Sequence, residues 1–286
     1  MRIFPYVISL TLLALSISSA YAAEFDADRL ADVLKKQPAE LQARYSYRNP
    51  QETLAFFGVT PDMTVVEALP GRGWYTKILI PYLGKQGQLI GADYAQDMYP
   101  KFGFFAKEFI ESKKTWVEDW SKEAQTWGDE DSAVVSAFVF GSMPENIKGT
   151  ADAVLFIRAL HNLKRFENDG GYLSTALDNA YQVLKPGGIV GVVQHLADES
   201  MSDEWAGGSN GYLKKSLIIK ELENAGFEYV DESRISINEK DQPTEKDMVW
   251  RLPPSLSTSK DNPELRTRLQ AIGESTRITL KFRKPE

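Results

Sequence analysis

The stretch from Val65 to Leu79, VVEALPGRGWYTKIL, decides how the rest of the chain is interpreted. It begins as an apolar run that reaches Glu67, passes through a turn with Gly71 and Gly73, and continues with the spacing of a helix. Such a turn typically receives a nucleotide-like ligand, because glycine lets the backbone approach without a Cβ in the way. A dinucleotide fingerprint needs a third glycine where this chain has Thr76, so the turn alone is a weak signal.

Strands and helices alternate along the chain after this turn. Strands are expected where apolar runs are bounded by turn residues, and amphipathic segments between them are expected to be helices. The expected strands lie at residues 64–69, 88–94, 133–140, 151–157, 189–195, 228–237 and 277–284, and the expected helices at 75–83, 99–127, 171–184 and 214–225. This order predicts an α/β fold whose sheet is largely parallel and covered by helices on both faces.

The first 22 residues have the pattern of an export signal. Arg2 precedes an apolar segment from about residue 7 to 20, and small residues at Ala20 and Ala22 form a cleavage site. The segment is shorter than the ~20 residues of a spanning helix, so no membrane insertion is expected after cleavage, with an uncleaved anchor as the alternative. The chain has no cysteine, which excludes disulfides and thiolate metal sites and suits a periplasmic location.

The remaining sequence is expected to contain a helical lead-in at residues 23–60 and one α/β domain at residues 61–286. Residues 238–259 are the longest irregular segment and are either a substrate-covering insertion or a surface loop. The formal net charge of −7 disfavours nucleic-acid binding.

Four features occur in a fixed order. Glu67 closes the first strand, the glycine turn follows, Asp93 closes the second strand, and LKPGG at residues 184–188 precedes the fifth. Together they resemble class I S-adenosylmethionine-dependent methyltransferases, which implies a Rossmann-like, doubly wound, mostly parallel sheet of about seven strands. Over roughly residues 50–286, the pieces EALPGRGWYT, LHN, GVVQH, NGY, LPP and IGESTRITLKF are similar to a narrower family of exported methyltransferases with a PGxGWYT first motif. Leu69 stands where the superfamily pattern has its first glycine.

The resemblance implies roles for the cofactor-binding residues. Glu67 would meet the ammonium of the cofactor's methionine part, Gly71 and Gly73 would form the turn beneath it, and Asp93 would accept both ribose hydroxyls. No acidic residue after the third strand matches the usual adenine contact, for which Ser142 and nearby backbone are the best substitutes. The alternative is an ordinary strand-to-helix connection with solvated carboxylates at the strand ends.

Methyl transfer to an acceptor that carries a proton requires a base, and near neutral pH histidine is suited to that task. The chain has two histidines, His161 and His195, both expected at the carboxyl ends of adjacent central strands. Each is a candidate catalytic base, with a hydrogen-bonded structural role as the alternative. Asn162 and Arg158 accompany His161 and are candidates for orienting or binding an anionic acceptor.

Two tyrosines are further candidates for contact with the acceptor. Tyr75 follows the glycine turn and Tyr212 lies in SNGYLKK, and for both the alternative is packing in the core. A metal is not expected, because no carboxylate stands at ligand spacing from either histidine, and no Gly-x-Ser-x-Gly elbow indicates a hydrolase.

The sequence therefore predicts an S-adenosylmethionine-dependent methyltransferase that acts on a small molecule. An exported, non-catalytic ligand-binding module with the same fold is the main alternative, because S-adenosylmethionine is made in the cytosol and nothing in the sequence explains its supply outside. A nicotinamide-dependent oxidoreductase is a third hypothesis. The acceptor and the oligomeric state are not determined by the sequence.

Overall fold

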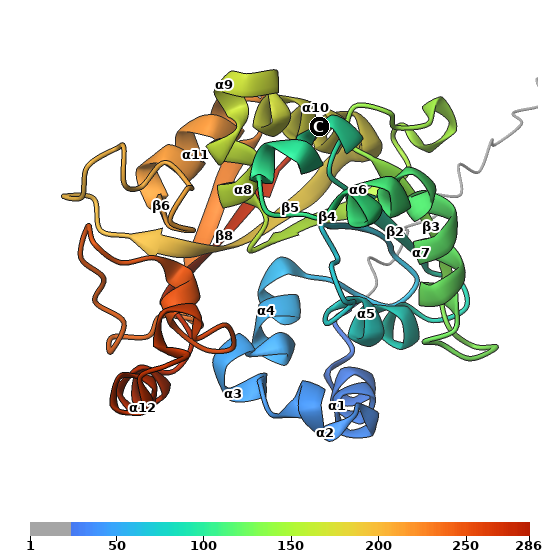
Figure 1. The fold of residues 1–286 in the computed structure, drawn as a ribbon. Coiled ribbons are helices and arrows are strands. Elements are labelled where there is room, and N and C mark those ends of the chain that lie inside the picture. The colour runs from blue at the N-terminus through green and yellow to red at the C-terminus, as the bar shows by residue number, and fades with distance from the viewer. Residues whose placement is uncertain (1–23) are drawn as a thin grey trace, which may run out of the picture.

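An eight-stranded sheet forms the centre of the computed structural model, which describes residues 24–286 (Figure 1). The signal peptide predicted at residues 1–22 lies outside the described residues. The strand order is β3-β2-β1-β4-β5-β8-β7, with β6 paired to β5. Strands β1 to β5 pair in parallel, whereas β8 is antiparallel to both of its neighbours. The strands are β1 (Thr64–Ala68), β2 (Gln88–Asp93), β3 (Val134–Val139), β4 (Ala151–Ile157), β5 (Leu184–Ala197), β6 (Leu213–Lys214), β7 (Glu228–Ser233) and β8 (Arg277–Arg283).

Helices cover both faces of the sheet. The α-helices are α1 (Ala27–Lys36), α2 (Ala39–Gln42), α3 (Tyr45–Arg48), α4 (Pro50–Phe57), α5 (Thr76–Leu83), α6 (Lys107–Ser112), α7 (Trp116–Gln125), α8 (Leu160–Arg165), α9 (Glu167–Gly170), α10 (Tyr172–Val183), α11 (Lys215–Asn224) and α12 (Pro263–Ile272). The 3-10 helices are η1 (Gln96–Phe102), η2 (Lys113–Thr115), η3 (Glu145–Ile147), η4 (Val249–Arg251) and η5 (Ser257–Ser259). In Figure 1, α1, α4 and α5 lie below the sheet, and α10 and α11 lie above it.

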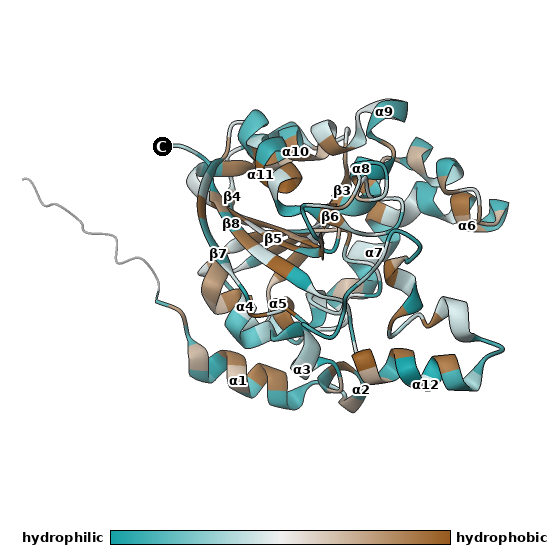
Figure 2. Cartoon of the chain, turned by 90° about the vertical axis from the view of Figure 1, so that its left-hand side faces the viewer, coloured by the Kyte–Doolittle hydropathy of each residue, from teal (hydrophilic) through white to brown (hydrophobic). Residues whose placement is uncertain are grey.

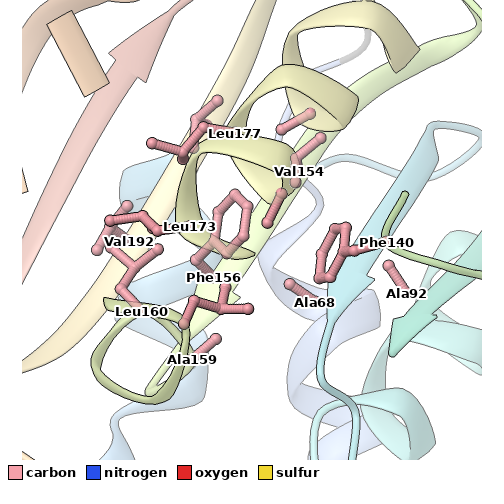
Figure 3. Packing of buried hydrophobic residues seen from close by; sticks show 14 of the residues in the cluster. Ala68, Ala92, Phe140, Val154, Phe156, Ala159, Leu160, Leu173, Leu177 and Val192 are labelled. Carbon is pink, nitrogen blue, oxygen red and sulfur yellow. The ribbon is translucent and has the colours of Figure 1, made fainter. Parts of the chain in front are cut away.

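The core has two layers because successive residues of a strand point to opposite faces. Val65 packs with the layer that contains α1, α4, α5 and α7, whereas Val66 packs with the layer that contains α8, α10 and α11. Figure 2 shows the hydrophobic strands running through the middle of the molecule. In the second layer Phe156 of β4 lies beside Leu173 and Leu177 of α10 (Figure 3). Burial on both faces explains why these strands are continuous apolar runs.

The prediction of a Rossmann-like α/β fold with a mostly parallel sheet is confirmed. The prediction of one long helix over residues 99–127 is wrong. Pro100 lies within η1 and has no N–H to donate, and Gly103 ends η1 with a φ of +76°. The segment therefore breaks into η1, α6, η2 and α7.

The Pro-Gly-Gly turn lies inside β5 rather than before it. Helix α10 ends at Val183 and β5 starts at the next residue, where Leu184 pairs with Ala151 of β4. The next pair joins Ile189 to Ala153, so residues 185–188 form a bulge opposite a single residue.

Short helices make up most of the N-terminal part, and the irregular segment has little regular structure. Helices α1 to α4 occupy most of residues 27–57, and residues 238–259 contain only the short helices η4 and η5. Within residues 24–286, no helix combines the length and the apolar character that crossing a bilayer requires.

The packing of Phe156 predicts a large effect on stability. Phe156 is fully buried, so Phe156→Ala should lower the free energy of unfolding by about 3–5 kcal/mol, measured by denaturant titration. Phe104→Ala is the matched control, because Phe104 is 69% exposed. Equal, small losses in both variants would contradict the assigned core.

Candidate ligand-binding site

A cavity of about 580 Å³ opens at the carboxyl ends of β1, β4 and β5. Its size lies in the usual range of small-molecule sites. Its walls come from the turn after β1, the start of α8, the end of β5, the N-terminal helices and the irregular segment. The lining residues are Pro38, Glu40, Leu41, Arg44, Arg48, Leu69, Pro70, Gly71, Arg72, Trp74, Lys77, Ile157, Arg158, His161, Asn162, His195 and Trp250.

The turn after β1 has a backbone that suits glycine. Gly71 lines the cavity with a φ of +57°, and Leu69 adopts a φ of +54°. Leu69 therefore takes the left-handed conformation at the position where the superfamily pattern has a glycine, which is strained for a side chain. Gly73 has a different role, because a Cβ there would overlap the ring of Trp127, and Gly73 does not line the cavity.

Glu67 lies behind the turn with its carboxylate buried. Its Oε2 accepts a hydrogen bond from Thr76 Oγ1 at 2.6 Å, and no ion pair reaches it from the described residues. Burial raises the pKa of Glu67 to about 7, although the hydrogen bonds from Thr76 oppose the shift. A buried carboxyl group without a counter-charge therefore lies behind the turn, and Glu67 does not line the cavity.

Asp93, in contrast, accepts hydrogen bonds from neighbouring residues on both of its carboxylate oxygens. Its Oδ2 accepts hydrogen bonds from Tyr99 Oη at 2.6 Å and from Lys113 Nζ at 3.0 Å, and its Oδ1 accepts one from the backbone N–H of Tyr94. Asp93 is buried and does not line the cavity. Ser142, predicted to stand near adenine, lies on an exposed turn outside the cavity.

Both histidines line the cavity, and their ring centroids are 5.4 Å apart. His161 Nδ1 lies 3.4 Å from Oε1 of Gln194, and His195 Nδ1 lies 2.6 Å from Oγ of Ser275. Burial lowers the pKa of His161 to about 4, and burial together with His161 holds the pKa of His195 well below its ordinary value. Both rings are therefore neutral at pH 7, the state in which an imidazole accepts a proton.

Arg158 and Asn162, the candidates for contact with an anionic acceptor, also line the cavity. Asn162 Nδ2 donates to Tyr94 Oη at 2.8 Å, which ties α8 to the end of β2. Arg158 has a φ of +59°, a second left-handed backbone at this edge of the sheet. Such strain tends to collect at functional sites.

Tyr75 and Tyr212 do not line the cavity. Both side chains are buried and pack in the core, which was the alternative to contact with the acceptor. Tyr75 Oη lies 3.3 Å from the carbonyl oxygen of Arg48, to which it donates, and its ring packs against Trp74. Tyr212 is fully buried, stacks on Trp205 and donates to Asp241.

The lining residues that were not predicted from the sequence include Arg44, Arg48 and Trp250. The arginines stand four residues apart in the lead-in, which the sequence reading treated as separate from the site. Trp250 lies in the irregular segment, with its ring centroid 6.0 Å from that of His161. The segment thus contributes to the cavity, as the substrate-covering alternative requires. No cluster of three or more metal-ligating side chains occurs among residues 24–286.

The buried state of the histidines predicts unusual titration. By NMR, the imidazole of His161 should titrate with a midpoint near pH 4 and show no titration at 6.5. Because the unfolded chain binds these protons at higher pH, folded-state stability should fall as pH decreases from 6.5 towards 4. The variant His195→Gln keeps only the imidazole signal of His161 and so assigns the two histidine signals. A titration midpoint near pH 6.5 for His161 would contradict its burial.

The raised pKa of Glu67 makes the folded state less stable as pH increases, whereas the lowered pKa values of the histidines make it less stable as pH decreases. The contribution of Glu67 to stability is fully present below its ordinary pKa of 4.5 and is lost as pH rises through about 7. The free energy of unfolding of Glu67→Gln should therefore rise relative to wild type between pH 5 and pH 8, measured by denaturant titration. Glu123→Gln, at an exposed position, is the control and should show no such trend.

Comparisons with known proteins identify the fold. No family model matches the sequence, and no curated protein matches it. A chain of the complex between the Haloferax volcanii Trm112 methyltransferase activator and its candidate methyltransferase is similar with a TM-score of 0.50 at 15% identity, over 91% of this chain and 99% of that one. A SAM-dependent methyltransferase from Aquifex aeolicus gives 0.48 at 17% identity, over 74% and 94%. The Burkholderia thailandensis 1,6-didemethyltoxoflavin-N1-methyltransferase, with 1,6-didemethyltoxoflavin and S-adenosylhomocysteine bound, gives 0.44 at 14%, over 93% of each chain. The chain has the Rossmann-like fold of class I methyltransferases, and membership in the narrower exported family stays a prediction.

Proposed function

We propose that the protein is an S-adenosylmethionine-dependent methyltransferase that acts on a small-molecule acceptor. The observation that carries the proposal is the arrangement at one sheet edge. Glu67 and Asp93 end adjacent strands on either side of the glycine turn, and the turn opens into a cavity that holds two neutral histidines. The methyltransferase-like fold supports it.

Two of the predicted cofactor-binding residues, Glu67 and Gly71, fit this cofactor as they stand. Buried Glu67 has no cationic partner, and the ammonium of the cofactor's methionine part would supply one. A Cβ on Gly71 would meet no atom closer than 3.9 Å, so the turn leaves space above it. Asp93 Oδ2 accepts hydrogen bonds from the hydroxyl of Tyr99 and the ammonium of Lys113. The ribose hydroxyls are also donors, and they would take the place of these two groups.

When bound, S-adenosylmethionine would supply an electrophilic methyl group. The neutral ring of His161 or His195 would accept the acceptor's proton as the new methyl bond forms and the sulfur keeps the electron pair of the broken bond. A ring with a low pKa is a weak base, so it suits an acceptor atom that becomes acidic during the transfer. Trp250 would orient the acceptor against the histidines and exclude water.

One observation favours the second candidate, a ligand-binding module without catalysis. The carboxylate of Asp93 is already satisfied by Tyr99, Lys113 and the backbone of Tyr94, so cofactor binding must exchange existing bonds. A module that had lost the cofactor would keep the cavity, while Tyr99 and Lys113 occupied the carboxylate that would otherwise bind the ribose.

Calorimetric titration of the purified protein separates these functions. S-adenosylmethionine and S-adenosylhomocysteine should bind with micromolar affinity and NAD should not, and Asp93→Asn should weaken binding about tenfold or more through the loss of a charged hydrogen bond. Asp261→Asn, at an exposed position, is the matched control. Absence of binding by both sulfur compounds would refute the methyltransferase proposal and favour the binding module.

A further inference from the structure

The cavity is strongly cationic in a chain whose formal net charge is −7. Glu40 is the only acidic side chain among its lining residues. The cationic side chains that line it are Arg44, Arg48, Arg72, Lys77 and Arg158. A concentration of one charge sign in a concave site raises the local concentration of ligands of the opposite sign.

Arg48 is the most deeply buried of these cations. The residue is 4% exposed, and its guanidinium lies over the ring of Trp74 at 4.3 Å. Its Nη1 is buried without a hydrogen-bond partner among the described residues, and its Nε lies 3.9 Å from Glu274 Oε2, too far for a hydrogen bond. A buried cationic donor without an acceptor is costly, which points to an anion that completes it.

Arg158, just after the end of β4, also has a buried guanidinium nitrogen without a hydrogen-bond partner in the part of the chain that the structure describes. Its buried Nε has no hydrogen-bond partner, and no carboxylate among residues 24–286 forms an ion pair with it. The left-handed backbone of Arg158 holds the side chain at the end of β4, three residues before His161.

The nearby carboxylate does not balance these charges. Glu274 pairs with Arg44 at 2.6 Å and with Arg277 at 3.3 Å. It lies 3.9 Å from Arg48, the longest of the three distances. Three guanidinium groups, those of Arg44, Arg48 and Arg277, therefore share one buried carboxylate, and Arg158 makes no ion pair with it. Burial and the neighbouring guanidinium groups lower the pKa of Arg48 and of Arg158, as expected for cations that lack a counter-charge.

We propose that Arg48 and Arg158 bind an oxyanion of the methyl acceptor, a carboxylate or a phosphate, and so hold its reacting atom against His161 and His195. The planar guanidinium fork matches both oxyanions, which it can bind through two hydrogen bonds. This inference rests on the proposed function, since it assigns the oxyanion to the acceptor. The other oxyanion source is the carboxylate of the cofactor's own methionine part.

The test is calorimetric titration of the purified protein with inorganic phosphate and, separately, with succinate, in a chloride buffer of low ionic strength. At least one should bind, and the tighter of the two identifies the oxyanion class. Arg48→Gln and Arg158→Gln should each weaken that binding about tenfold or more, as expected for the loss of a charged hydrogen bond. Arg266→Gln, on the exposed face of α12, is the matched control.

Arg48→Lys keeps the charge at the buried position, and a thermal melt of each variant shows that it is folded. A higher oxyanion affinity in Arg48→Lys than in Arg48→Gln supports the site even if the glutamine variant is less stable, because lysine keeps the charge but not the fork. Absence of binding by either oxyanion, or equal affinities in wild type and both glutamine variants, overturns the proposal.

Titration of the same variants with S-adenosylhomocysteine separates this inference from the proposed function. Its affinity should stay within about threefold of wild type in Arg48→Gln and Arg158→Gln, less than the loss of one charged hydrogen bond would cause. A loss as large as that for the oxyanion would assign the arginines to the cofactor and overturn the acceptor proposal while leaving the methyltransferase. Absence of S-adenosylhomocysteine binding by wild type would refute the methyltransferase, and with it the acceptor assignment, whatever the oxyanions do.

Discussion

Parallel pairing of β1, β2, β4 and β5 is the constraint on which the rest of the site depends. Because parallel strands all emerge at the same edge of the sheet, residues far apart in the chain meet there. Glu67, Asp93, Arg158 and His195 each stand within two residues of the carboxyl end of one of these strands. The antiparallel strand β8 reverses the direction and places its first residue, Arg277, opposite His195 at the same edge.

The sequence predicted those features that depend on neighbours along the chain. Buried strands appear as apolar runs and helices as amphipathic segments, so the strand ends near Glu67, Asp93 and His195 could be located. His161, which was also predicted at a strand end, lies instead in α8. The error at residues 99–127 has the same origin. Aromatic residues at helical spacing suggested one helix, whereas Pro100 and Gly103 break the hydrogen-bond ladder that such a helix requires.

The parts of the site that the sequence did not reveal are contacts between distant segments. Arg44 and Arg48 reach the cavity because the N-terminal helices fold against the connection between α12 and β8, and helical spacing alone carries no information about that contact. Likewise, Tyr99 and Lys113 satisfy Asp93 only because η1 and η2 fold back over the end of β2. Propensity and periodicity describe single elements, whereas these bonds depend on tertiary arrangement.

The ion pairs of Glu274 join the two ends of the folded chain. Arg44 precedes the first strand of the sheet, and Glu274 immediately precedes β8, the last one. Figure 1 shows α3 and α12 in neighbouring positions below the sheet. The wall formed by Arg44 and Arg48 is therefore held by a carboxylate 230 residues further along the chain from Arg44, so a change at this distant ion pair would alter the cavity without touching the glycine turn or the histidines.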